Sequence, residues 1–256
     1  MKTNKLENVE TTETFPQDKK YIDEMTTEIA TITMILKNET VIRELLRASS
    51  FINLAVDKIY NILKKTNSGR IIYSGAGTSG RMGVLDGVEL LPTFGWPSER
   101  VAFVIAGGMK ALTRSVEGAE DQFHDGFSEA LKLNSNSSDV LISLSASGNS
   151  KFTLGTVSAA KQQQTFSIGI SNNLKSSLKE TCDLHIPILT GGELIAGSTR
   201  LNAGTSQKIC LNIISSLVMS KLGRVKKGLM IDMIASNKKL KERQKKIEIS
   251  LTSKVK

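Results

Sequence analysis

Residues 70–83 read RIIYSGAGTSGRMG, a short apolar run followed at once by a glycine-rich turn. An apolar run that closes in glycine predicts a buried strand, and the glycines beyond it let the chain turn sharply into a helix. A strand, a tight turn and a helix form the repeating unit of α/β proteins. We therefore expect the first central strand at 70–74 and a helix directly after it.

The chain beyond this unit alternates in the same way between apolar runs and segments of helical periodicity. The expected strands are 101–106, 139–145, 165–171 and 183–188, and the expected helices are 110–131, 151–163, 174–180, 199–222 and 226–249. Strands that are apolar throughout are typical of a parallel sheet covered on both faces. The predicted fold class is α/β, a three-layer αβα sandwich with a five-stranded parallel sheet. Two or three helices between residues 22 and 65 precede it.

The charge of the chain is concentrated at its C-terminal end. The 256 residues suffice for one large α/β domain or two small ones, and the net charge of +9 raises the question of nucleic-acid or membrane binding. Residues 221–256 contain twelve Lys/Arg and three Asp/Glu, so residues 1–220 contain 22 of each sign. Because the main part of the chain is neutral, we expect neither a nucleic-acid nor a membrane partner.

Composition also indicates the compartment. The polar residues 1–20 do not resemble a signal peptide, and the chain contains no apolar run of transmembrane length. The two cysteines, Cys182 and Cys210, cannot form a disulfide scaffold, and His124 and His185 are not spaced as metal ligands. We expect a reduced, cytoplasmic protein without a metal site.

Two loops beyond the carboxyl ends of the predicted strands suit an anion, and this is where ligands bind in parallel sheets. Residues 75–83, GAGTSGRMG, place hydroxyls and backbone amides at a positive helix N-terminus. Residues 145–150, SASGNS, add hydroxyl donors at the same sheet edge. A tight turn with a serine cap would explain either loop alone, but the two together predict one phosphate site. Its candidate phosphate ligands are Thr78, Ser79, Ser145, Ser147 and Ser150, and Gly77, Gly148 and Asn149 of the same loops are further substrate-binding candidates.

Acidic residues supply the candidate catalytic groups. Glu89 lies within the apolar run DGVELLPTFG, inside the predicted helix after the first loop, where partial desolvation would suit proton transfer. Glu117 and Glu120 are three apart in VEGAED and are expected to share a helix face. A solvated surface position is the ordinary alternative for each glutamate. A polar loop at 191–208 ends the set, with Glu193, Ser198 and Arg200 before the next helix.

These segments together resemble the bacterial N-acetylmuramic acid 6-phosphate etherases, sugar isomerase (SIS) domain proteins related to the glucokinase regulatory protein. Four stretches carry the resemblance, in the family's order and at similar spacing. They are IIYSGAGTSGRMGVLDGVELLPTFG (71–95), VIAGGMKALTRSVEGAED (104–121), GSTRLNAGTSQK (197–208) and LMIDMIASNKKLKER (229–243). The combination is far more specific than any one of these motifs.

The resemblance implies a reaction on a small sugar phosphate. The D-lactyl ether of N-acetylmuramic acid 6-phosphate is cleaved by elimination and hydration, without metal or organic cofactor, as part of peptidoglycan amino-sugar recycling. Glu89 is implied as the acid/base of lactate elimination and Glu120 as the residue that assists water addition, although the two roles could be exchanged. A homodimer is also implied. We place Glu117, Glu193, Ser198 and Arg200 among the substrate-binding residues.

The resemblance also suggests how the chain is divided. We expect an N-terminal arm with helices that pack on the domain or a dimer partner (1–66), an SIS sugar-phosphate-binding domain (67–223) and a basic C-terminal helix (224–256). The family continues beyond this point into a small helical domain, which we expect to be absent. That difference, and SGNSKF at 147–152 where the family reads SGRTPY, keep two alternatives open. They are a non-catalytic sugar-phosphate-binding regulator and an aldose–ketose sugar phosphate isomerase with Glu193 as base.

Overall fold

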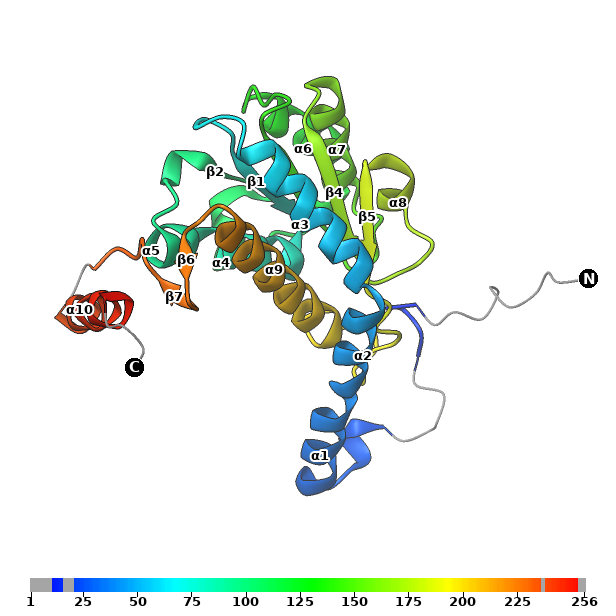
Figure 1. Ribbon diagram of the computed structural model, residues 1–256. Helices are drawn as coiled ribbons and strands as arrows, with labels where there is room; N and C mark the ends of the chain where they lie inside the picture. Colours follow the sequence, from blue (N-terminus) through cyan, green and yellow to red (C-terminus); the bar gives the residue numbers. More distant parts are fainter. Residues whose placement is uncertain (1–10, 16–20, 236–237, 253–256) are drawn as a thin grey trace, which may run out of the picture.

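The computed structural model describes residues 11–15, 21–235 and 238–252 (Figure 1). Five parallel strands form its central sheet in the order β2-β1-β3-β4-β5. They are β1 (Ile71–Gly75), β2 (Val101–Ile105), β3 (Val140–Leu144), β4 (Phe166–Ser171) and β5 (Leu184–Pro187). The predicted five-stranded parallel sheet is confirmed, and each predicted strand boundary is within one residue of the observed one.

Helices cover both faces of this sheet because both faces are apolar. In β1, Ile71 and Tyr73 belong to one buried cluster and Ile72 to another, since successive strand residues point to opposite faces. The first cluster is closed by α2 (Glu39–Arg47), α3 (Ser49–Leu63), α4 (Gly77–Val88), α5 (Leu90–Phe94) and α9 (Asn202–Lys221). The second is closed by α6 (Phe123–Leu131), α7 (Lys151–Gln162) and α8 (Ser177–Thr181). The predicted αβα sandwich is thus confirmed.

Glycines position the turn between β1 and α4. A Cβ on Gly75 would lie 2.8 Å from the carbonyl oxygen of Leu144, and one on Gly80 would lie 2.8 Å from the carbonyl oxygen of Gly75. Gly77 has φ +54°, in the left-handed region, although the space around it is open. The turn therefore brings the first backbone amides of α4 against the carboxyl end of the sheet.

The helix predicted over 110–131 is wrong in its first half. Two short 3-10 helices (Gly108–Leu112 and Ala119–Asp121) and a loop precede α6. Gly107, Gly108 and Gly118 have φ of +79°, +66° and +68°, and left-handed residues interrupt an α-helix. Glu117 and Glu120 therefore do not share a helix face, as the sequence pattern had suggested.

The helix predicted over 226–249 is also wrong in its first part. Strands β6 (Val225–Lys226) and β7 (Leu229–Met230) form an antiparallel hairpin, and α10 (Lys238–Thr252) begins only beyond it. Lys227 and Gly228 at the turn have φ of +52° and +74°. Two successive positive φ values are the mark of the type I′ turn that closes two-residue hairpins.

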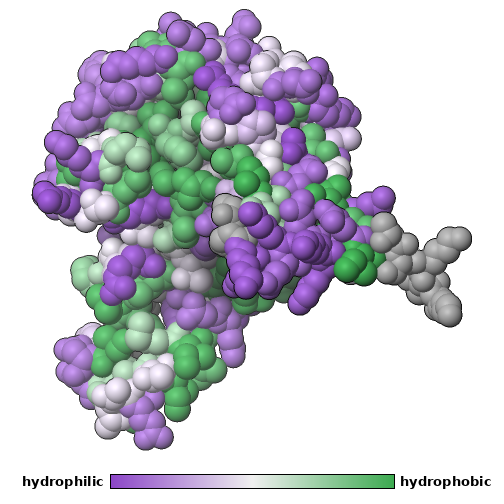
Figure 2. Space-filling view, turned by 90° about the vertical axis from the view of Figure 1, so that its left-hand side faces the viewer, coloured by the Kyte–Doolittle hydropathy of each residue, from purple (hydrophilic) through white to green (hydrophobic). Residues whose placement is uncertain are grey.

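The N-terminal helices differ in how they meet the body. Helix α3 belongs to the core through Ile52, Ile59 and other buried side chains, whereas α1 (Thr27–Lys37) buries no residue and projects away from the sheet (Figure 1). Figure 2 shows hydrophobic side chains on this projection, and the exposed residues of α1 include Ile29, Ile32, Ile35 and Leu36. Of the predicted polar arm, only residues 11–15 are described.

Membrane insertion is not supported by any helix of the described ranges, since none combines the required length with sufficient apolar character.

Candidate functional site

Two loops surround a cavity of about 250 Å³ at the carboxyl end of β1 and β2, which we call the site pocket. The turn into α4 forms one side of it, and the loop after the 108–112 helix forms the other. The lining residues are Ala76, Gly77, Thr78, Arg81, Ala106, Ala111, Ser115, Val116, Glu117, Gly118, Ala119 and Glu120. Four of the predicted site residues, Gly77, Thr78, Glu117 and Glu120, are thus brought together.

The predicted serine loop, residues 145–150, lies next to this pocket. Gly75 at the end of β1 is in register with Leu144 at the end of β3, so the loops that follow the two strands are neighbours. The hydroxyl of Ser150 donates to the backbone carbonyl of Glu120 at 3.2 Å. This hydrogen bond ties the serine loop to the segment that carries Glu120.

The start of α4 is suited to bind an anion. The first amides of a helix have no acceptor within it, and the helix dipole makes this end positive. Ser79 is buried and Thr78 is partly buried in this first turn. A Cβ on Gly204 would lie 3.2 Å from Cγ2 of Thr78, which shows that the first turn of α9 packs against the same turn.

The serine loop is pre-formed by its own hydrogen bonds. The hydroxyl oxygen of Ser145 accepts from the Gly148 amide at 3.1 Å, and that of Ser147 accepts from the Asn149 amide at 3.1 Å. A hydroxyl that accepts one bond retains its own hydrogen for donation. The two hydroxyl oxygens are also 3.5 Å apart, so if one donates to the other, the second still has a hydrogen that can be offered to an anion.

Asn149 faces away from the site pocket. Its side-chain oxygen accepts from the amide and the hydroxyl of Ser177, each at 2.9 Å, at the start of α8. Gly148, with φ +73°, leaves no room for a Cβ beside Ser176. These contacts hold the shape of the serine loop, and they are visible only in the tertiary structure.

Glu117 and Glu120 are both exposed at the rim of the site pocket. The hydroxyl of Ser115 donates to Glu117 Oε1 at 2.9 Å, which orients that carboxylate. No described side chain donates to the carboxylate of Glu120. Within the part of the chain that the structure describes, the carboxylate of Glu120 therefore lacks a side-chain donor, whereas that of Glu117 has one.

Glu89 lies at the opposite end of α4 from the site pocket. The helix has 12 residues, and at 1.5 Å per residue its two ends are about 18 Å apart. The side chain of Glu89 is exposed, like that of Val88, while Leu90 is 1% exposed. The expected partial desolvation is therefore wrong for this chain on its own, because Glu89 ends α4 on its solvent side.

Glu193 and Arg200 lie elsewhere. Glu193 is 2% exposed, and its two carboxylate oxygens accept from the amides of Asn202 at 3.0 Å and Ala203 at 2.9 Å. It therefore caps the N-terminus of α9. Arg200 is exposed and shares a separate cavity of about 230 Å³ with Glu193 and α1, while Ser198 lines neither cavity.

Two charged residues were missed by the sequence reasoning, one at the site pocket and one towards the far end of α4. Arg81 lies three residues after Thr78, hence on the same side of α4, and lines the site pocket. Asp86 is 3% exposed and accepts hydrogen bonds from Tyr73, Asn212 and Ser215 at 2.9–3.0 Å. Burial raises the pKa of Asp86, and the three hydrogen bonds oppose that rise. The i, i+3 spacing could have revealed Arg81, but no local signal marks Asp86.

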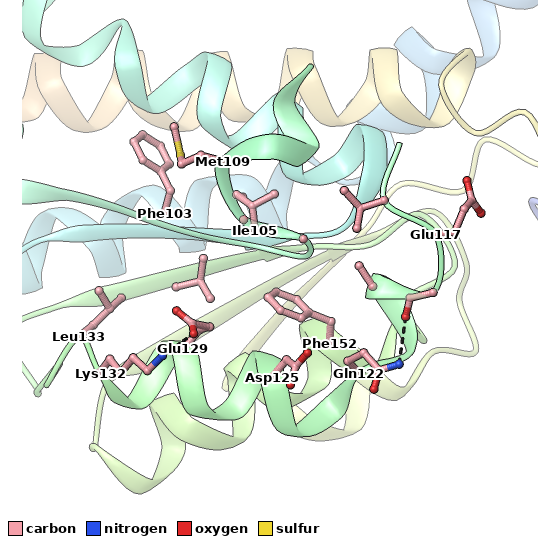
Figure 3. A pocket seen from close by; sticks show the side chains of 16 residues that line it. Phe103, Ile105, Met109, Glu117, Gln122, Asp125, Glu129, Lys132, Leu133 and Phe152 are labelled. Atoms are coloured by element: carbon pink, nitrogen blue, oxygen red, sulfur yellow. Dashed lines mark hydrogen bonds and ion pairs between the residues drawn. The ribbon is translucent and has the colours of Figure 1, made fainter. Parts of the chain in front are cut away.

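A larger groove of about 740 Å³ runs beside the edge strand β2 (Figure 3). Phe103, Ile105 and Phe152 form its apolar floor, and Asp125 and Glu129 of α6 lie along one side. It shares residues 116–119 with the site pocket, so that segment separates the two cavities. None of the predicted phosphate-binding residues lines this groove.

Comparison with solved structures supports the fold. The phosphoheptose isomerase of Francisella tularensis matches with a TM-score of 0.55 and 17% identity, over 76% of this chain and 100% of that one. The phosphoheptose isomerase of Neisseria gonorrhoeae matches with a TM-score of 0.51 and 16% identity, over 75% of this chain and 96% of that one. At such identities the likeness concerns the SIS fold alone.

Comparison of sequences identifies the family. Residues 54–161 match the model of the glucokinase regulatory protein N-terminal SIS domain. N-acetylmuramic acid 6-phosphate etherases of Clostridium acetobutylicum and Deinococcus radiodurans are 47% and 45% identical over 75% and 70% of this chain, and the matched regions span 63% and 59% of their lengths. The etherase of Mycoplasma mycoides subsp. mycoides SC is 38% identical over 99% of this chain and 83% of its own length. On these matches, the chain belongs to the N-acetylmuramic acid 6-phosphate etherase family.

Proposed function

We propose that this chain cleaves the D-lactyl ether of N-acetylmuramic acid 6-phosphate with water, releasing N-acetylglucosamine 6-phosphate and D-lactate. One observation carries the proposal: an anion-binding helix N-terminus, at Gly77 and Thr78, and a free carboxylate, Glu120, line the same pocket. The names of the relatives support the same activity. The Francisella and Neisseria neighbours are named for a sugar phosphate, which supports a ligand of that class.

The phosphate is proposed to bind at the start of α4. Backbone amides of residues 77–79 and the hydroxyls of Thr78, Ser145 and Ser147 would donate to its oxygens. Several backbone amides and hydroxyls at a helix N-terminus can stabilise a phosphate as direct donors. This mode of binding explains why residues 1–220 can be neutral overall and still take an anionic substrate.

The reaction needs proton transfer at carbon 2 of the open-chain sugar and at the oxygens that leave and join carbon 3. A base removes the proton on carbon 2, which the adjacent aldehyde acidifies. The bond between carbon 3 and the ether oxygen breaks, and an acid protonates the departing lactate oxygen. Water then adds across the double bond, with its hydroxyl at carbon 3 and a proton at carbon 2. These steps require only an acid and a base, so we propose no cofactor.

Glu120 is the carboxylate that one copy of the chain offers for these transfers, and we assign it to water addition. Glu89, assigned to lactate elimination, lies about 18 Å away along α4. Both glutamates act on one substrate only if Glu89 comes from a second copy. A homodimer that aligns the end of α4 with the partner's site pocket satisfies this requirement, and the roles of the two glutamates could be exchanged.

The substrate class suggests the setting. A phosphorylated muramic acid is a breakdown product of peptidoglycan, and sugar phosphates are formed and retained inside cells. We therefore propose a cytoplasmic role in the recycling of cell-wall amino sugars. Residues 67–223 contain the sheet, the two loops of the site pocket and the serine loop, and we propose them as the sugar-phosphate-binding unit, between an N-terminal part (1–66) and a basic C-terminal part (224–256).

A regulator that binds a sugar phosphate without cleaving it is the second candidate. The position of Glu89 favours it, because one copy alone offers a phosphate site and a single free carboxylate. An isomerase with Glu193 as base has less support. Both oxygens of that carboxylate are occupied by backbone amides of α9.

The decisive experiment measures D-lactate released from N-acetylmuramic acid 6-phosphate. Wild-type protein should release it, and Glu120→Gln should lower kcat by about 10²–10⁴-fold, the usual contribution of a general acid or base. Glu129→Gln, on the exposed side of α6, is the matched control and should retain the wild-type rate. Wild-type protein that binds the sugar phosphate but releases no lactate would establish the regulator instead, and an isomeric sugar phosphate without lactate would establish the isomerase.

A further inference from the structure

Arg81 is the cationic side chain among the residues that line the site pocket, all of which lie in the described part of the chain. It is partly buried on the side of α4 that also carries Thr78. The other lining residues with ionisable side chains are Glu117 and Glu120. The pocket therefore combines one fixed positive charge with two carboxylates.

The guanidinium of Arg81 is held in place without a counter-charge. Its Nε donates to the carbonyl of Ala111 at 2.9 Å and its Nη2 to that of Arg114 at 3.1 Å. Across the described ranges, no carboxylate oxygen lies within 4.0 Å of its nitrogens, and none of the described residues accepts from Nη1. By contrast, the partly buried Arg70 is paired with Asp139 at 2.7 Å.

An arginine fixed in this way is suited to bind an anion. A guanidinium has five N–H groups in a rigid plane, matches a carboxylate geometrically, and is more easily desolvated than an ammonium. Two carbonyl contacts orient the plane and leave further donors for a ligand. The proposed function gives the phosphate its donors at the start of α4 and in the serine loop, which leaves Arg81 for a second anionic group.

The substrate of the proposed function has such a group. The lactyl ether carries a carboxylate, which N-acetylglucosamine 6-phosphate lacks. Resting on that function, we propose that Arg81 binds the lactyl carboxylate and thereby selects the muramic acid sugar over its glucosamine counterpart. Without this positive charge, the lactyl carboxylate would meet Glu117 and Glu120 across a small pocket, and like charges at short range repel strongly.

The test compares two ligands that differ only in this group. They are N-acetylmuramic acid 6-phosphate and its lactyl carboxamide, measured by calorimetry on the Glu89→Gln/Glu120→Gln double variant, which lacks both proposed proton-transfer groups, so that neither ligand is consumed. We expect the acid to bind at least about tenfold more tightly than the amide, as a charge-assisted pair predicts. When Arg81→Gln is added, the two affinities should agree within about twofold.

Controls separate recognition from a structural role. Arg114→Gln changes an exposed arginine whose backbone, not its side chain, contacts Arg81, and it should preserve the preference for the acid. Arg81→Lys keeps the positive charge but lacks the planar guanidinium with its paired donors, and it should preserve part of the preference for the acid. If Arg81→Gln weakens the binding of both ligands by the same factor, Arg81 serves only to hold the 111–114 loop in place. That result would overturn the proposal.

The outcomes also separate this proposal from the proposed function. If the Arg81 variants do not fold, the two ligands still test the proposal on the Glu89→Gln/Glu120→Gln protein alone, where equal affinities would contradict it. A preference for the acid combined with no lactate release from wild-type protein would support Arg81 as a recognition residue and refute the etherase activity.

Discussion

His185 lies beneath the serine loop, where small polar groups fit closely together. Its Nε2 is 2.8 Å from the hydroxyl of Ser171 and 3.4 Å from that of Ser176, and Ser176 in turn packs against Gly148. Burial, and to a smaller extent the charge of Lys179, lower the pKa of His185 to about 4. The imidazole is therefore neutral at pH 7 and supports the loop as a hydrogen-bonding group.

This arrangement predicts a stability loss in mild acid. The folded pKa of about 4 is below the ordinary value of about 6.5, so between these values the unfolded state binds more protons. The free energy of unfolding then falls as the pH falls from about 6.5 towards 4, by about 1–2 kcal/mol once solvent screening is allowed for. Urea unfolding from pH 7 to 4 measures it, and the difference between wild type and His185→Gln isolates the histidine. If the free energy of unfolding depends on pH in the same way in wild type and His185→Gln, the prediction is contradicted.

At the scale of elements, helix α9 depends on a residue outside it. Glu193 approaches through a loop and accepts from the amides of Asn202 and Ala203, with 2% of its surface exposed. The helix N-terminus is positive and its first amides lack acceptors within the helix. A buried carboxylate there neutralises the positive end and accepts from the free amides. Since the first turn of α9 packs against Thr78, this cap also supports the site pocket from behind.

Removing the cap should destabilise the protein without acting on chemistry directly. Glu193→Ala is expected to lower the free energy of unfolding by about 2 kcal/mol, and Glu193→Gln by less, because its amide oxygen still accepts one bond. Urea denaturation measures both variants, with exposed Glu129→Gln as the control. Unchanged stability combined with a lost reaction would instead assign Glu193 to catalysis, as the isomerase alternative requires.

Sequence patterns predicted the strands well and some helices poorly, for a physical reason. Buried strands such as β3 are short apolar runs between polar turns. The change from apolar to polar residues therefore marks where each strand begins and ends. The errors at 110–131 and 226–249 arose where Gly118 and Lys227 adopt positive φ. Whether a residue enters the left-handed region depends on the turn it must close, and apolar periodicity carries no information about that.

At the scale of the whole molecule, one copy leaves two features without a partner. Glu89 is exposed at the end of α4 opposite the site pocket, and α1 exposes Ile29, Ile32 and Ile35. A helix of 11 residues is only marginally stable in water without packing. A second copy that covers these surfaces would stabilise α1 and supply Glu89 to the other site.

Mixing two inactive variants tests this arrangement. Glu89→Gln and Glu120→Gln should each lack lactate release, but in a mixed dimer one of the two sites contains both wild-type glutamates. With random exchange, about half of the dimers are mixed, so about a quarter of the wild-type activity should return. Each variant mixed with itself is the control. No recovery, with subunit exchange verified by affinity tags, would mean that the two glutamates do not act across the interface.

The sequence alone determined the parallel sheet, the glycine turn into α4, the two hydroxyl-rich loops and the family, because these depend on residues close together along the chain. Only the tertiary structure decided which distant side chains meet. It placed Glu120 with Thr78 and Arg81, used Glu193 as a helix cap, and left Glu89 at the far end of α4. These outcomes depend on how whole elements pack across the sheet, and spacing along the chain does not specify that packing.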